Sequence, residues 1–165
     1  MFVIREDLPP ILRSVAFLLG VWEGDGQGEY PPDVEPFVYK QRITIETNED
    51  KPYLVHESRT WNPETGAPMA MEMGFWRPQP DGSVELVLSH PTGFVEVYYG
   101  TITARSVELA TDAVVRTASA KEVSASKRLY GITPDEDLGY VVEMAAMGQP
   151  LRPHLSAKLT KIADR

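Results

Sequence analysis

The chain lacks cysteine entirely across its 165 residues. This absence excludes a disulfide scaffold, a thiolate metal site, attachment of a cofactor through cysteine, and catalysis by a thiol. The sequence also contains no Gly-x-Ser-x-Gly elbow and no His-Glu-x-x-His helix, so no familiar hydrolase mechanism is indicated.

Positive charge is scarce, with 16 lysines and arginines against 24 acidic residues and a net charge of −8. Such a balance disfavours nucleic acid or an anionic membrane as the main partner. No apolar run approaches the length of a membrane-spanning helix, and residues 1–7 carry acids where a signal peptide would be basic. We therefore expect a soluble, cytoplasmic protein with no nucleic-acid or membrane partner, and a homo-oligomer remains open.

Helical patterns are also few. Pro9 and Pro10 suit a first helical turn, residues 11–19 give an apolar stripe, and Gly20 ends it, so we expect one short N-terminal helix acting as a lid. A hydrophobic content of 42% can bury a real core, and the length suits a single domain spanning residues 1–165.

After the helix, short runs of β-branched and aromatic residues alternate with turn signals at roughly ten-residue spacing. This rhythm indicates an all-β barrel or sandwich with about ten strands. The clearest strand segments are residues 43–46, 84–88, 95–99 and 138–144. Residues 114–124 contain alanines that allow either a short helix or an irregular connection.

Glycine recurs at every second position from Gly20, with Trp22 between, in the run Gly-Val-Trp-Glu-Gly-Asp-Gly-Gln-Gly-Glu-Tyr. In a strand this spacing clears one face of side chains, which suits a bend at a barrel rim or a flat ligand against the backbone. From spacing alone a glycine-rich loop is an equal alternative. The absence of a following Gly-Lys-Ser/Thr argues against a phosphate loop.

The stretch from Gly20 to Gly26 matches the GxWxGxG signature of the nitrobindin family. Segments similar to that family follow in the same order, at residues 28–31, 36–39, 51–54, 74–78, 84–93, 120–123 and 147–155. The resemblance covers nearly the whole chain. It implies a single ten-stranded, antiparallel, calycin-like β-barrel that binds one haem b per chain. It further implies a peroxynitrite isomerase, whose ferric iron binds nitric oxide and converts peroxynitrite to nitrate.

By this resemblance His154 is the axial ligand of the haem iron and the catalytic residue. A neutral imidazole suits that role, because a single axial ligand leaves the opposite position open. From the residues alone, a lone histidine is more often structural, so His56 is interpreted as structural and His90 as a turn residue near the barrel mouth. Further cofactor contacts are expected at Lys127, Gly20, Trp22, Gly24 and Gly26.

The last strand poses a question of register, because Leu155, Ala157 and Leu159 alternate on one face and His154 falls on the other. If the leucine face is the core, we expect His154 at the strand entrance or beside a bulge where Pro153 breaks the register.

Two departures from the family pattern affect the distal side. Ala70 follows Pro-Met where many members carry a histidine, so that distal hydrogen-bonding group is missing. The distal side would then be more apolar, with Met69, Met71, Met73 or Phe75 as candidate walls, although strand alternation places these four on the face opposite Ala70. The segment at residues 30–37 also lacks the family's Tyr-Pro-Thr, so no haem contact from that threonine is expected.

Charged residues are assigned to two regions. Lys127, Arg128 and Arg152 are candidate partners for haem propionates or an incoming anion, or else ordinary surface cations. The carboxylates of Glu57, Glu72 and Glu96 are expected on the outer face of the barrel.

Two other functions remain open at this point. A lipid- or metabolite-binding calycin barrel would not need His154, and in it Trp22 would pack under a cation such as Lys158. A non-catalytic haem carrier or nitric-oxide sensor would need His154 without turnover.

Overall fold

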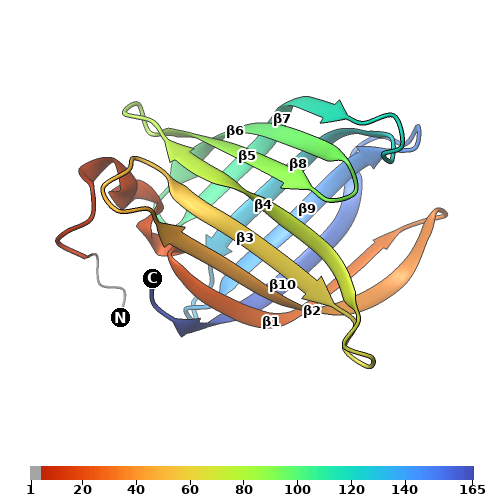
Figure 1. The fold of residues 1–165 in the computed structure, drawn as a ribbon, viewed down its shortest axis with the longest axis horizontal. Helices are drawn as coiled ribbons and strands as arrows, with labels where there is room; N and C mark the ends of the chain where they lie inside the picture. Colours follow the sequence, from red (N-terminus) through yellow and green to blue (C-terminus); the bar gives the residue numbers. More distant parts are fainter. Residues whose placement is uncertain (1–4) are drawn as a thin grey trace.

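The computed structural model describes residues 5–165; residues 1–4, the start of the acidic segment discussed above, lie outside the described part. Ten antiparallel strands form a closed barrel with one short helix at one end (Figure 1). Each strand pairs with its neighbour in sequence, and β1 pairs with β10 to close the sheet. The strands are β1 (Gly20–Tyr30), β2 (Val34–Thr47), β3 (Leu54–Trp61), β4 (Pro68–Pro78), β5 (Ser83–His90), β6 (Phe94–Thr103), β7 (Ser106–Arg116), β8 (Val123–Ile132), β9 (Leu138–Ala146) and β10 (Arg152–Ala163).

The strand segments expected from the sequence are confirmed, because each lies within one of these strands. The stretch at residues 114–124 is the irregular connection rather than a helix: β7 continues to Arg116, a turn follows, and β8 begins at Val123. Gly66, Gly82 and Gly93 lie in turns between strands, at φ values of 72°, 85° and 102°. Only glycine adopts this left-handed region readily, which explains why the turns fall there.

The expected N-terminal helix is a 3₁₀-helix, η1 (Pro10–Leu18), which closes one end of the barrel (Figure 1). Its apolar residues Leu12, Val15, Phe17 and Leu18 are buried and belong to the main core. Because this end is filled with apolar side chains, it leaves no room for a polar ligand. Among the described residues, no helix is long and apolar enough to cross a membrane.

Trp22 ties the helix to the barrel. Its ring is buried, and its indole N–H donates to the carbonyl of Leu18 at 2.9 Å. The ammonium of Lys161 lies 4.9 Å from the ring centroid. The expected Lys158 was therefore the wrong cation: Lys158 pairs with Asp135 and Asp137 at the outer surface. The β1–β10 register, which shifts at Val21/Trp22, sets Lys161 opposite Trp22.

The glycine face of β1 is occupied by aromatic rings of β2. Gly26 lies opposite Tyr39 and Gly28 opposite Phe37 in the antiparallel register. A Cβ at Gly26 would meet the Tyr39 ring at 2.2 Å, and one at Gly28 would meet the Phe37 ring. The cleared face thus lets two rings lie on the strand backbone, and it ends at the buried ring of Tyr30.

Candidate functional site

A cavity of about 520 Å³ opens at the end of the barrel opposite η1. This volume falls within the usual range of ligand pockets, roughly 300–1,000 Å³. Its walls come from β2, β3, β4, β6, β8, β9 and β10, together with the turn after β5. Apolar rings and methionines line its upper part, whereas charged and hydroxyl groups form its floor.

Arg128 is the centre of the floor and is 7% exposed. Its guanidinium makes a two-pronged contact with the Glu72 carboxylate, at 3.0 and 2.9 Å. It also donates to the hydroxyls of Tyr98 and Tyr130, each at 2.9 Å, and approaches Glu96 at 3.5 Å. The donors of Arg128 are therefore engaged by protein groups, so its role is to hold the floor together.

Two carboxylates of this network were placed wrongly by the sequence analysis. Glu72 and Glu96 lie inside the barrel, whereas Glu57 is on the outside as expected and contacts Arg59. The phase of β4 gives the reason: Glu72 lies two and four residues before the buried Gly74 and Trp76, so it shares their interior face. Arg128 supplies the positive charge that makes this burial tolerable.

The charges on the floor shift the acidities of the buried groups. Burial alone would raise the pKa of Glu72, but Arg128 and His56 outweigh it and hold that pKa well below its ordinary value. Burial would also raise the pKa of Glu96. The hydrogen bond with His90 and the charge of Arg128 outweigh burial, so the pKa of Glu96 is lowered. Burial raises the pKa of Tyr130 to about 12. Both carboxylates are therefore ionised at neutral pH.

His56 and His90 both contact these carboxylates. His56 is fully buried: its Nδ1 accepts from the Trp76 indole at 3.1 Å, which leaves Nε2–H facing Glu72 at 3.2 Å. This arrangement fits the structural role expected for His56. His90 ends β5, stacks on Phe94 with centroids 4.0 Å apart, and lies 2.6 Å from Glu96. It lines the cavity, near the mouth as expected.

A second polar chain crosses the cavity wall. The Tyr140 hydroxyl donates to Gln41 at 2.6 Å, so Tyr39 is the donor in the 2.7 Å contact between the two tyrosine hydroxyls. The Gln41 amide donates in turn to Ser58 at 2.8 Å. These bonds fix the Tyr39 ring over Gly26 and complete the floor beside Arg128.

His154 lies at the cavity wall on an irregular part of β10. Between Pro153 and Leu155 the pairing with β9 shifts, so the bulge expected at this position is confirmed. The ring nitrogen Nδ1 lies 3.0 Å from the backbone carbonyl oxygen of Glu29. Because a carbonyl only accepts, Nδ1 carries the proton and Nε2 of the neutral ring carries the lone pair.

The environment of His154 favours this neutral form. Burial lowers the pKa of the imidazole, the carbonyl of Glu29 opposes that shift, and the charges of Lys121 and Arg128 add to it. Within the described part of the chain, Nε2 has no hydrogen-bond partner, and the residue lines the cavity. A half-buried imidazole with a free lone pair has the chemistry of a metal ligand.

The structure separates the other residues expected to contact a cofactor. Gly20 and Trp22 belong to the closed end, and Gly24 packs against the β10 backbone at Lys158 and Leu159. Of the signature residues, Gly26 comes nearest to the cavity, through the Tyr39 ring that it accommodates.

Lys127 lies on the outer face of β8, in opposite phase to the buried Arg128, and does not line the cavity. Two exposed cations line the cavity among the described residues: Arg59, which pairs with Glu57, and Lys121, in the connection before β8, which sequence reasoning missed. Arg152 lies over the Tyr30 ring, with 5.8 Å from its Cζ to the centroid, and donates to the Pro31 carbonyl.

The distal walls expected on β4 are only partly in place. Met69, Ala70 and Met71 lie at the cavity rim. Met73 and Phe75 are 43% and 46% exposed and do not line it. Ala70 contributes no polar group beyond its backbone, so this wall has no side-chain hydrogen-bond donor at that position.

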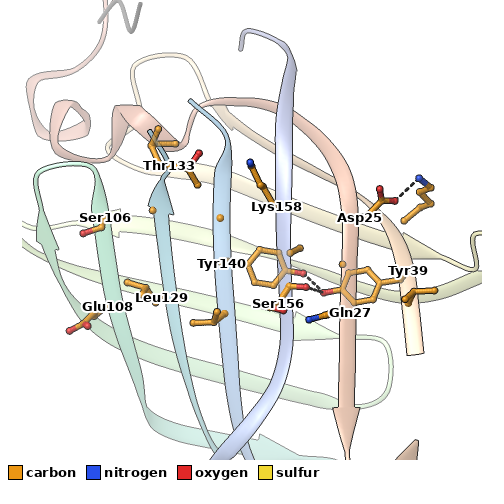
Figure 2. Close-up of a pocket in the computed structure, with 18 of the residues that line it drawn as sticks. Asp25, Gln27, Tyr39, Ser106, Glu108, Leu129, Thr133, Tyr140, Ser156 and Lys158 are labelled. Carbon is orange, nitrogen blue, oxygen red and sulfur yellow. Dashed lines mark hydrogen bonds and ion pairs between the residues drawn. The ribbon is translucent and has the colours of Figure 1, made fainter. Parts of the chain in front are cut away.

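A larger hollow of about 1,110 Å³ lies on the outside of the barrel (Figure 2). Lys158, Gln27 and Ser156 line it, and Asp25 forms an ion pair with Lys40 at its edge. Tyr39 and Tyr140 also line this hollow, and Figure 2 shows their hydroxyl groups meeting. Among the residues that the structure describes, no histidine and no buried charge lines the outer hollow, so the interior cavity is the better candidate despite its smaller volume.

Comparison with known proteins identifies this class of barrel. Residues 11–161 match the family described as the THAP4-like, heme-binding beta-barrel domain, and the chain belongs to that family. It is therefore a haem-binding β-barrel by family.

Relatives over nearly the full length carry a more specific name. A protein of Nocardioides sp. named peroxynitrite isomerase is 46% identical, with 97% of this chain and 98% of that protein covered. A ferric nitrobindin-like protein of Thermobifida fusca is 39% identical, with 96% and 98% covered. The crystal structure of Rv2717c from M. tuberculosis superposes with a TM-score of 0.85 at 38% identity, covering 94% of this chain and 99% of that one. The chain thus belongs to the peroxynitrite isomerase family, and the expected nitrobindin resemblance is confirmed.

The residues of the cavity fit a haem. A single neutral imidazole with a free Nε2 is the donor that haem iron takes in a one-ligand site. The methionines of the rim, Phe94 and Leu155 offer apolar contact to a macrocycle, and Lys121 at the mouth suits an acidic side group.

Proposed function

We propose that this protein binds one haem b per chain through Nε2 of His154, and that the ferric form isomerises peroxynitrite to nitrate and binds nitric oxide. One observation supports the proposal above the others: Nδ1 of His154 meets the Glu29 carbonyl, so the lone pair of Nε2 is left for a metal. The names of the relatives support the reaction.

When bound, ferric haem supplies an open coordination position for a small anion, and isomerisation needs no external electrons. The chain's own residues prepare this position. His154 stays neutral at physiological pH because burial lowers its pKa, so no proton competes with the metal for Nε2. The Glu29 carbonyl orients the ring and increases its basicity.

The rest of the cavity governs access. Lys121 places a positive charge at the mouth of a protein whose net charge is −8, and this charge attracts an anionic substrate. The rim methionines and Phe94 limit the entry of water. Ala70 offers no distal hydrogen bond, so we expect the reaction to depend on the metal and its axial histidine rather than on a polar group at that position.

Rapid mixing of peroxynitrite with the apoprotein and with the haem-loaded ferric protein tests this function. We expect the decay rate to rise in proportion to the ferric protein, with nitrate replacing the nitrite formed in the uncatalysed reaction. The apoprotein and a haem-loaded K127A variant serve as the inactive and the active control. A ferric protein that binds haem through His154 yet leaves the decay rate unchanged would instead be a haem carrier or a nitric-oxide sensor.

A further inference from the structure

The sheet alone does not set the orientation of His154. Its backbone lies at the bulge, where the pairing with β9 passes from Pro153–Glu143 to Leu155–Val142 and skips His154. The regular pairing of β10 with β1 ends one residue away, at Leu155 and Gly28. The direction of the ring must therefore come from side-chain contacts.

Those contacts come from the last two residues of β1. The Glu29 carbonyl accepts from Nδ1 at 3.0 Å. The Tyr30 ring meets the imidazole edge to face, with centroids 5.6 Å apart and an interplanar angle of 79°. Together they determine both the tautomer and the tilt of the ring.

Tyr30 is itself anchored to the end of β9. Its side chain is fully buried in a small second core with Val123, Met144 and Ala146. Its hydroxyl accepts from the backbone N–H of Ala146 at 2.9 Å and donates to the carbonyl of Met144 at 3.0 Å. One hydroxyl thus joins the end of β1 to the end of β9.

We propose that Tyr30 is a positioning residue for the His154 site. By holding the end of β1 against β9, it keeps the Glu29 carbonyl at Nδ1, so the lone pair of Nε2 is set before any ligand arrives. The class of ligand, a metal porphyrin that takes one imidazole, rests on the function proposed above; the positioning itself does not. A preset ligand loses less conformational freedom on binding, and partners of this kind commonly change metal affinity by about 10- to 100-fold.

The test compares Y30F, which keeps the ring and removes only the hydroxyl, with Y99F. Tyr99 is 51% exposed on the outer face and is the matched control. Nitrogen-15 NMR of the histidine rings in the apoproteins should show the Nδ1–H form of His154 in the wild type and in Y99F, and a mixture with the Nε2–H form in Y30F. Transfer of haemin from Y30F to apomyoglobin should be about tenfold faster than from the wild type or Y99F.

A Y30F protein with the wild-type tautomer and the wild-type transfer rate overturns the positioning role. If far-UV circular dichroism shows that Y30F does not fold, the same NMR measurement on R152Q tests the positioning role. Arg152 covers the Tyr30 ring and bonds to the Pro31 carbonyl without touching the Tyr30 hydroxyl. R152Q should shift the tautomer in the same direction by a smaller amount, and an unchanged tautomer in R152Q overturns the proposal. A wild-type protein that binds no haemin refutes the proposed function. The NMR comparison of the apoproteins still tests whether Tyr30 sets the tautomer of His154.

Discussion

The two ends of the barrel are built from the same strands and filled in opposite ways. At the η1 end the interior is apolar, and Trp22 is covered by helix, strand and Lys161. At the mouth the interior holds an ionised Arg128–Glu72 pair below a cavity lined by His154. The comparison teaches that the signature strand β1 serves both ends: its tryptophan stabilises the closed end, and its last residues orient the histidine of the open end.

The largest effect is expected at the closed end. W22A removes a buried ring together with its bond to Leu18, and we expect a loss of about 3–5 kcal/mol in the free energy of unfolding. Urea unfolding of the apoprotein measures the loss. The folded fraction should still take up haemin with wild-type affinity, and a loss below about 1 kcal/mol would show that the closed end is not the stabilising one.

A comparable loss is expected from breaking the charged floor. E72Q leaves the buried Arg128 without its main counterion, which should lower the free energy of unfolding by about 3–5 kcal/mol. E57Q is the matched control, since Glu57 pairs with Arg59 at the surface and should change stability by less than about 0.5 kcal/mol. Equal stabilities for E72Q and E57Q would contradict the role of the floor.

Acid should weaken the same floor gradually. The folded state holds the pKa values of Glu72 and Glu96 below their ordinary value of 4.5, so below about pH 4.5 the unfolded chain binds more protons than the folded one. The stabilisation is complete above that pH and is lost as the pH falls toward the folded pKa values. Urea midpoints at pH 7, 4.5 and 3.5 should fall in that order, and less steeply in E72Q. A midpoint in the wild type that does not change with pH would contradict this.

The smallest effect separates the two lysines. K121A should slow the binding of azide to the ferric haem protein by about two- to threefold at low ionic strength, because it removes a single exposed charge at the mouth. K127A should leave the rate unchanged, since Lys127 lies on the outer face. Stopped-flow mixing measures both rates. A slower rate in K127A alone would show that Lys127, expected from the sequence to contact the cofactor, is the lysine that attracts the anion.

The all-β class, the short helix and the bulge at His154 could be predicted from local signals: turn residues, a Pro-Pro start and Pro153 against the leucine phase. The closed ten-stranded barrel followed from the family resemblance, because the turn spacing fits a sandwich equally well. The interior positions of Glu72 and Glu96 could not be predicted, because a charged residue is expected on the outer face of a strand unless a buried partner is known. That partner is Arg128, which lies far along the chain. The pairing of Trp22 with Lys161 depends on a register between the first and last strands, which a sequence of this length does not specify locally.

The most direct test of the central claim is a haemin titration of the apoprotein, followed at the Soret band, with H154A beside the wild type. The wild type should saturate at one haemin per chain with a ferric spectrum of single-histidine ligation. H154A should lose that spectrum and regain it when free imidazole is added. A wild type that never saturates, or an H154A variant with the same spectrum and affinity, would contradict the claim that Nε2 of His154 binds the haem iron.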